Sequence, residues 1–200
     1  LVKTGLIPAI TWGGPAFGTP PSTAARQRKT IASACAAPGG RACALSTIAV
    51  RLGTKYEPWT RAVAEQTQWF LRHWQSGSSV DRKAIRLFWM KNRERLVGAP
   101  PSSRWQRVNG PIGATIACLA TIGWNPNAPD VWFSRDKTKW TMEGLTAGHM
   151  PVKCMELIQS INADALRMVE AEAPTYGSRG LATGIEWRQV ALRIAQLRRH

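Results

Sequence analysis

Residues 58–97 have the sequence PWTRAVAEQTQWFLRHWQSGSSVDRKAIRLFWMKNRERLV, and this stretch decides the fold class. Pro58 suits the first turn of a helix that runs until Ser76-Gly77-Ser78. Residues of one face recur along it at steps of three and four: Ala62, Gln66, Trp69, Phe70 and His73. Asp81 is expected to cap a second helix, whose inward residues would be Ile85, Phe88, Trp89 and Leu96. The centre of the chain is therefore predicted to be two amphipathic helices.

Helical patterns continue on both sides of this centre. Upstream, Ser22 or Thr23 could cap a helix to about Ala36, ended by Pro38-Gly39-Gly40, and another spans Ala44–Leu52 before Gly53. Downstream, a predicted helix over Ile112–Ile122 starts after Asn109-Gly110-Pro111 and ends at Gly123, and a last one spans Ile185–Leu197. Between them an amphipathic helix over 152–168 is predicted from apolar residues that recur at three- and four-residue steps: Val152, Met155, Ile158, Ile161, Ala165 and Met168.

One segment departs from the helical pattern. Val131-Trp132-Phe133 and Lys139-Trp140-Thr141 flank Arg135-Asp136-Lys137, which favours a β-hairpin near 130–142. Pro100-Pro101-Ser102-Ser103 is the best candidate for an internal boundary between residues 1–99 and 100–200. We therefore expect a mainly α, multi-helix protein with one small β-hairpin.

The charge of the chain is strongly positive and unevenly distributed. The 200 residues hold 27 Lys and Arg against 12 Asp and Glu, a formal net charge of +15. No acidic residue precedes Glu57, and residues 81–107 hold eight basic and two acidic residues. Such blocks favour a polyanionic partner, of which RNA or DNA is the first to consider. The alternative is an ordinary solvated face.

Cations in these blocks are the candidate contacts to a phosphate backbone, because they could form a stripe along helix faces. They are Arg26, Arg28, Lys29, Arg82, Lys83, Arg86, Lys91, Arg93, Arg95, Arg104 and Arg107. Most of the ten tryptophans are expected to anchor the core. Trp89 and Trp105 lie beside basic runs and are the candidates for stacking on bases.

The chain carries no recognisable catalytic motif, neither a phosphate-binding glycine loop nor a nucleophile elbow. Its histidines and cysteines lack metal-ligand spacing, so we predict no catalytic residues, no metal site and no cofactor. Glu65, Asp81 and Asp136 would form a carboxylate site only if the fold happened to gather them. Two weak signals remain: His149 is a base or a loop residue, and Pro38-Gly39-Gly40-Arg41 is an anion nest or a turn.

Cysteine usage and hydropathy bear on the compartment. Cys35, Cys43, Cys118 and Cys154 suit buried thiols in a reducing compartment, nucleus or cytoplasm, and no secretion signal is recognised. No apolar run reaches membrane-spanning length, so no membrane partner is expected. The chain opens on Leu1, which suggests a piece of a longer protein.

A series of short signals occurs in an order that resembles a known family. The signals are Gly5-Leu6-Ile7-Pro8-Ala9-Ile10-Thr11-Trp12-Gly13, a helix with Arg26 and Arg28, the loop Pro38-Gly39-Gly40-Arg41, Leu52-Gly53 with Glu57-Pro58, and Gly110-Pro111 leading to Leu119 and Ile122-Gly123-Trp124. Over most of residues 1–172 this order resembles the region downstream of the polymerase palm in reverse-transcriptase polyproteins of retrotransposons, especially those of dinoflagellate genomes.

The resemblance implies a thumb-like or connection region over about residues 1–99, gripping the template–primer backbone, with an accessory region after it. The polymerase activity of that family depends on metal-binding palm aspartates, and no Asp-Asp pair occurs in this chain. We therefore expect a non-catalytic, nucleic-acid-binding helical segment, with the rest of a longer polyprotein as a partner.

Two other function classes stay open at this point. A basic structural or assembly subunit of a ribonucleoprotein or organellar complex would use dispersed basic patches and tryptophan-rich interfaces. An enzyme with an unrecognised site would need convergent polar groups in a deep pocket.

Overall fold

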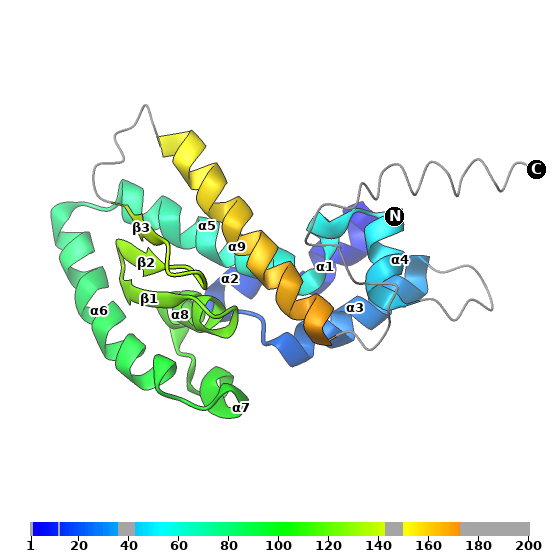
Figure 1. Ribbon diagram of the computed structural model, residues 1–200, viewed down its shortest axis with the longest axis horizontal. Coiled ribbons are helices and arrows are strands. Elements are labelled where there is room, and N and C mark those ends of the chain that lie inside the picture. Colours follow the sequence, from blue (N-terminus) through cyan, green and yellow to red (C-terminus); the bar gives the residue numbers. More distant parts are fainter. Residues whose placement is uncertain (1, 12, 36–42, 143–149, 173–200) are drawn as a thin grey trace, which may run out of the picture. The chain divides into compact units, whose positions relative to one another are not determined.

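The computed structural model describes residues 2–11, 13–35, 43–142 and 150–172, and it is mainly α-helical with one small antiparallel sheet (Figure 1). The order of elements is η1 (Val2–Leu6), α1 (Ile7–Thr11), α2 (Gly14–Phe17), α3 (Pro21–Cys35), α4 (Ala44–Arg51), η2 (Thr54–Tyr56), α5 (Pro58–Ser76), α6 (Ser79–Val97), α7 (Pro101–Arg104), η3 (Trp105–Arg107), α8 (Gly110–Thr121), β1 (Asn125–Ala128), β2 (Val131–Phe133), β3 (Lys139–Thr141) and α9 (Met150–Glu172). The predicted fold class is confirmed.

The described residues form two compact units. The first contains residues 2–11, 21–35, 43–61 and 165–172, and the second contains 13–20, 62–142 and 150–164. The sequence boundary expected at Pro100–Ser103 lies inside the second unit, at the start of α7, with α6 and α8 packed together on either side of it.

The first unit has a small aliphatic core between α1, α3 and α4. Ile7, Ile31 and Ile48 have no exposed surface, and the half-buried Leu6, Ile10 and Leu52 pack around them. The two helices predicted here are found, but α3 begins at Pro21, so neither Ser22 nor Thr23 lies before its first turn as a cap. Proline suits this place because the first turn needs no backbone N–H donor.

An aromatic cluster forms the centre of the second unit. The Phe70 ring of α5 lies with its centroid 4.8 Å from Trp89 of α6 and 5.8 Å from Trp132 of β2. The Trp89 and Trp132 rings are nearly parallel, at 6° and with centroids 6.1 Å apart. All three are buried, so α5, α6 and the sheet are joined by the large apolar area of these rings.

The sheet has the strand order β1-β2-β3, antiparallel throughout. Strands β2 and β3 pair Val131 with Thr141 and Phe133 with Lys139, which confirms the predicted hairpin. The third strand, β1, was not expected, because its sequence Asn125-Pro126-Asn127-Ala128 has low β-propensity. Its edge position accommodates the proline, because proline has no backbone N–H to donate and an edge strand pairs on one side only.

Helix α9 confirms the amphipathic helix predicted over 152–168, and Ile161 and Ala165 of its predicted apolar face are buried. Leu157 is buried as well, whereas Val152 and Met155 of the predicted apolar face are exposed. The predicted helix Ile185–Leu197, the loop at Pro38–Arg41 and His149 lie outside the described residues. No helix within the described ranges is long and apolar enough to cross a membrane.

Candidate nucleic-acid interface

Helix α6 carries most of the predicted phosphate contacts, and its start is defined by a capping box. The backbone N–H of Asp81 donates to the Ser78 hydroxyl at 3.2 Å, and the N–H of Ser78 donates to the Asp81 carboxylate at 2.9 Å. Ser78 is therefore the N-cap, where the sequence pointed to Asp81. Hydrogen bonds from Ser78 hold the pKa of Asp81 below its ordinary value.

The inward face of α6 packs on α8 and β1, and Figure 1 shows α6 along one side of the sheet. Trp89 and Leu96 have no exposed surface, and the Trp89 Nε1–H donates to the Pro126 carbonyl at 3.2 Å. The backbones approach closely at Gly113 of α8, where a Cβ would lie 3.3 Å from the Asn92 Oδ1. This packing fixes which side chains of α6 face outward.

The outward face of α6 presents a group of cations. Arg82, Lys83, Arg86, Lys91 and Arg95 are exposed. The helix has two acidic residues, Asp81 in the capping box and Glu94. The outward face therefore has a local excess of positive charge near the surface, which suits a phosphate backbone.

Three of these cations are also held by the protein, and one of them, Arg95, donates to the Asn92 Oδ1 at 2.8 Å. The Arg82 guanidinium donates to the carbonyls of Trp74 at 3.0 Å and Gln75 at 3.1 Å, at the end of α5. Arg86 pairs with the Asp130 carboxylate at 2.8 Å, and its guanidinium lies 5.4 Å from the Trp74 ring centroid. Arginines so anchored have less freedom to follow a ligand than Lys83 or Lys91.

Arg93 and Arg104 face inward to different degrees. Arg93 is half-buried, and its buried Nε has no hydrogen-bond partner within the described part of the chain. Arg104 is only 8% exposed and donates to the carbonyls of Leu96 at 3.0 Å and Ala99 at 3.3 Å. Burial lowers the pKa of its guanidinium. Arg104 thus closes the end of α6 and is withdrawn from the predicted phosphate contacts, whereas Arg107 is exposed.

The two predicted base-stacking tryptophans serve packing. Trp89 has no exposed surface, because its ring is enclosed in the aromatic cluster. No base could therefore stack on it. Trp105 is half-buried against Gly18, where a Cβ would lie 2.8 Å from the indole ring. Gly18 has φ +75°, so the site needs glycine both for its backbone and for the close approach of Trp105.

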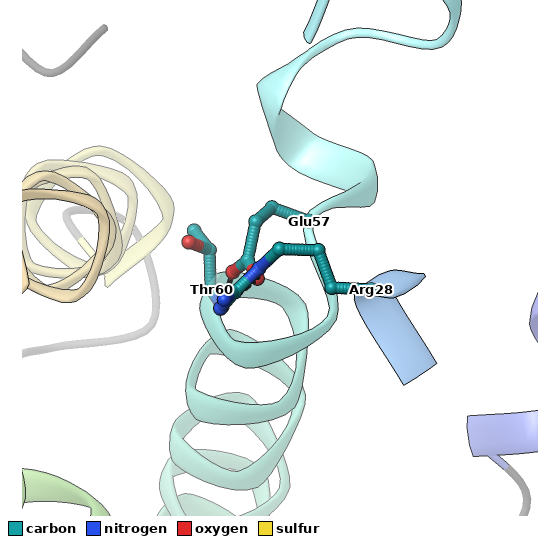
Figure 2. A network of polar contacts seen from close by, with 3 residues as sticks. All are labelled: Arg28, Glu57 and Thr60. Carbon is teal, nitrogen blue, oxygen red and sulfur yellow. Dashed lines mark hydrogen bonds and ion pairs between the residues drawn. The ribbon is translucent and has the colours of Figure 1, made fainter. Parts of the chain in front are cut away.

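The remaining predicted contacts belong to α3 in the first unit, and one of them is structural (Figure 2). The Arg28 side chain, 14% exposed, pairs with the fully buried Glu57 at 2.7 Å. The second carboxylate oxygen of Glu57 accepts the Thr60 N–H at 2.7 Å, in the first turn of α5. Arg28 therefore neutralises a buried helix cap, while Arg26 and Lys29 are exposed.

Sequence reasoning missed a set of exposed apolar residues on α6. Val80 and Leu87 are each 72% exposed, Met90 is 60% exposed and Phe88, expected inward, is 59% exposed. The sequence held a signal for this second face, because the apolar residues of α6 form two frames, that is, two sets that lie on different sides of the helix. Assigning the inward frame to Trp89 and Leu96 leaves Val80, Leu87 and Met90 on the opposite side.

No group of acidic, histidine or cysteine side chains that could hold a metal ion occurs in the described ranges. Three aspartates of the described chain each accept a hydrogen bond from the protein: Asp81 from Ser78, Asp130 from Arg86 and Asp136 from Ser134. Of the cysteines, Cys118 is buried, which raises its thiol pKa, and Cys35, Cys43 and Cys154 are half-buried. Comparison with protein-family models, with curated proteins and with solved structures found no match to this chain.

Proposed function

We propose that this chain binds RNA or DNA by its phosphate backbone, without choice of sequence, through the outward face of α6. One observation carries the proposal: this face holds Lys83, Lys91 and Arg95 exposed, with Glu94 as the carboxylate among them. A helix of 19 residues is about 28 Å long, enough to pass several phosphates. Contacts of this kind supply affinity and carry no base information.

In the fuller form of the proposal, the chain is a non-catalytic segment of a retrotransposon reverse-transcriptase polyprotein that grips the template–primer. The order of short signals from Gly5-Leu6 to Ile122-Gly123-Trp124 supports this origin. A mainly helical fold with a basic helix is compatible with it. The longer parent would be the RNA-directed DNA polymerase.

The binding test is a salt series with duplex DNA and an RNA–DNA hybrid. Three to five phosphate contacts should make log K fall with a slope of about −3 to −5 against log salt. Reversing Lys83, Lys91 and Arg95 to Glu should reduce this slope by about 3. A matched control reverses Lys137, Lys139 and Lys153, which are also exposed and lie in the second unit. Equal losses of nucleic-acid affinity in both variants would mean that the positive charge of the chain acts as a diffuse field, and that α6 forms no specific interface.

A second test concerns catalysis. Offered primer–template, deoxynucleotides and magnesium or manganese, the chain should extend nothing, because two-metal phosphoryl transfer needs carboxylates that hold two ions about 4 Å apart. The readout is primer extension on a sequencing gel, with the complete polyprotein as the positive control. Extension that disappears on mutation of Asp81, Asp130 or Asp136 would contradict the proposal.

The second candidate function, an assembly subunit of a ribonucleoprotein or organellar complex, is favoured by a different observation. Exposed Val80, Leu87 and Met90 gain nothing from phosphates, whereas a protein interface would bury them. The salt series separates the two functions, since an assembly subunit need not bind free nucleic acid.

A further inference from the structure

Large exposed apolar side chains concentrate on α6. Seven such residues occur in the described chain, and four of them, Val80, Leu87, Phe88 and Met90, lie within this one helix. Single exposed apolar residues need no explanation, but several on one helix face mark a contact surface. The surface that a partner would cover is therefore the outward face of α6.

Three of these residues follow the spacing of a helix-packing seam. Val80, Lys83, Leu87, Met90, Glu94 and Val97 succeed one another at steps of three, four, three, four and three residues. Steps of this kind keep side chains on one line of a helix that packs against a second helix. Leu87 lies nine residues before the buried Leu96, about half a turn around the helix, so this seam faces away from α8.

The charges around the seam indicate the chemistry of the partner. Lys83 lies within the seam and Lys91 beside it, and both are exposed. Acidic side chains along the edges of an opposing helix would pair with these ammonium groups. A lipid surface fits less well, because Lys83 and Glu94 lie in the line of the apolar residues and would be carried toward hydrocarbon with them.

We propose that the seam of α6, defined as Val80, Lys83, Leu87, Met90, Glu94 and Val97, docks an amphipathic helix of a partner protein whose apolar stripe is flanked by Asp or Glu. The partner helix packs on Leu87 and Met90 at the centre of the seam. Its carboxylates pair with Lys83 and Lys91. The proposal goes beyond nucleic-acid binding, and the two functions share only these lysines.

The probe is a synthetic helical peptide with Leu at the a and d positions and Glu at e and g, whose own pairing is opposed by its charge. The control peptide carries Lys at e and g. The full chain should bind the Glu peptide at least tenfold more tightly than the Lys peptide in fluorescence anisotropy. Bound Glu peptide should also slow hydrogen exchange of the α6 amides.

The variant Leu87→Gln with Met90→Gln should lose at least tenfold in affinity for the Glu peptide. Both side chains are exposed, so the fold is retained, and circular dichroism checks this. Its matched control is Val152→Gln with Met155→Gln, two residues of α9 that are each 57% exposed, which should bind the peptide as the wild type does. Nucleic-acid binding by both variants should stay within twofold, so failure of one proposal leaves the other standing.

Several results would overturn the docking proposal. Equal binding of the Glu and Lys peptides would exclude a preference for a partner helix with acidic edges. Unchanged peptide binding by the α6 variant would show that the seam is not the docking surface. A halved mass of the α6 variant in light scattering would assign the seam to a second copy of the chain, and binding only to phosphatidylserine vesicles would assign it to a lipid surface.

Discussion

Arg28 on α3 and Lys83 on α6 both stand in basic stretches of sequence, yet the structure uses them in opposite ways. Arg28 is paired with a carboxylate that has no exposed surface, and that carboxylate caps α5. Lys83 is exposed on the outward face of α6. Removing one partner of a buried ion pair lowers the free energy of unfolding, because the other charge is left unpaired. An exposed cation can be removed with little effect on folding. The cations of a basic stretch of sequence therefore divide into those that stabilise the fold and those that are exposed and available to a ligand.

The division runs through α6 and its surroundings as well. Arg104 fills the end of the helix, Arg86 is tied to Asp130, and Lys91 is exposed. Of the cations predicted to contact phosphate, Arg28 and Arg104, whose guanidinium groups bind protein partners at buried sites, are the least available. The following substitutions test the division from the largest expected effect to the smallest.

Arg28→Met should lower the free energy of unfolding by about 3–5 kcal/mol, because Glu57 would be left as an uncompensated buried charge. The matched control is Arg26→Met, exposed on the same helix, which should cost no more than about 0.5 kcal/mol. Urea unfolding followed by circular dichroism measures both. Similar stabilities of the two variants would mean that the Arg28–Glu57 pair has no structural role.

Arg104→Met should cost about 2–3 kcal/mol, since the Leu96 and Ala99 carbonyls lose a charged donor in a buried place. Arg107→Met removes the same charge at an exposed position three residues later and should stay within about 0.5 kcal/mol. The same unfolding experiment compares them. Nucleic-acid affinity should fall for Arg107→Met and stay unchanged for folded Arg104→Met. The reverse result would mean that Arg104 contacts the nucleic acid.

Ser78→Ala should cost about 1 kcal/mol by removing the N-cap of α6. The Asp81 side of the same capping box is pH-dependent. Its pKa is lower in the folded chain than in the unfolded one, so its contribution is complete above the ordinary carboxyl range and is lost as pH falls through the folded pKa. The stability difference between wild type and Asp81→Asn should shrink from pH 7 to pH 3. A constant difference would show that the carboxylate charge is not what matters.

Much of the helical framework was predictable from neighbouring residues. Pro58 and the three- and four-residue steps after it marked α5, and Gly53 and Gly123 marked the ends of α4 and α8. The hairpin was predictable from alternating residues around a turn. Strand β1 was not, because its pairing with β2 supplies what its own sequence lacks.

The candidate interface was predictable only in part. The sequence located the basic helix and placed Trp89 inward, which its burial confirms. It also offered Trp89 to a base, placed Phe88 inward and assigned Arg104 to a phosphate, and the structure shows Trp89 and Arg104 buried and Phe88 exposed. The inward face of α6 depends on Gly113 of α8, which lets Asn92 and Leu96 approach. That contact is not visible in the periodicity of α6 alone, where two apolar frames compete.

The sequence by itself determined the helical class, the positions of most helices and the excess of positive charge, because these follow from composition and from residues within one or two turns. The tertiary structure alone decided which cations are buried and which apolar residues are left outside. Those outcomes rest on partners distant in the chain: Glu57 is 29 residues from Arg28, and Pro126 is 37 residues from Trp89. Burial is a property of such pairs, so a local pattern can indicate a charged helix without showing which side chains remain exposed.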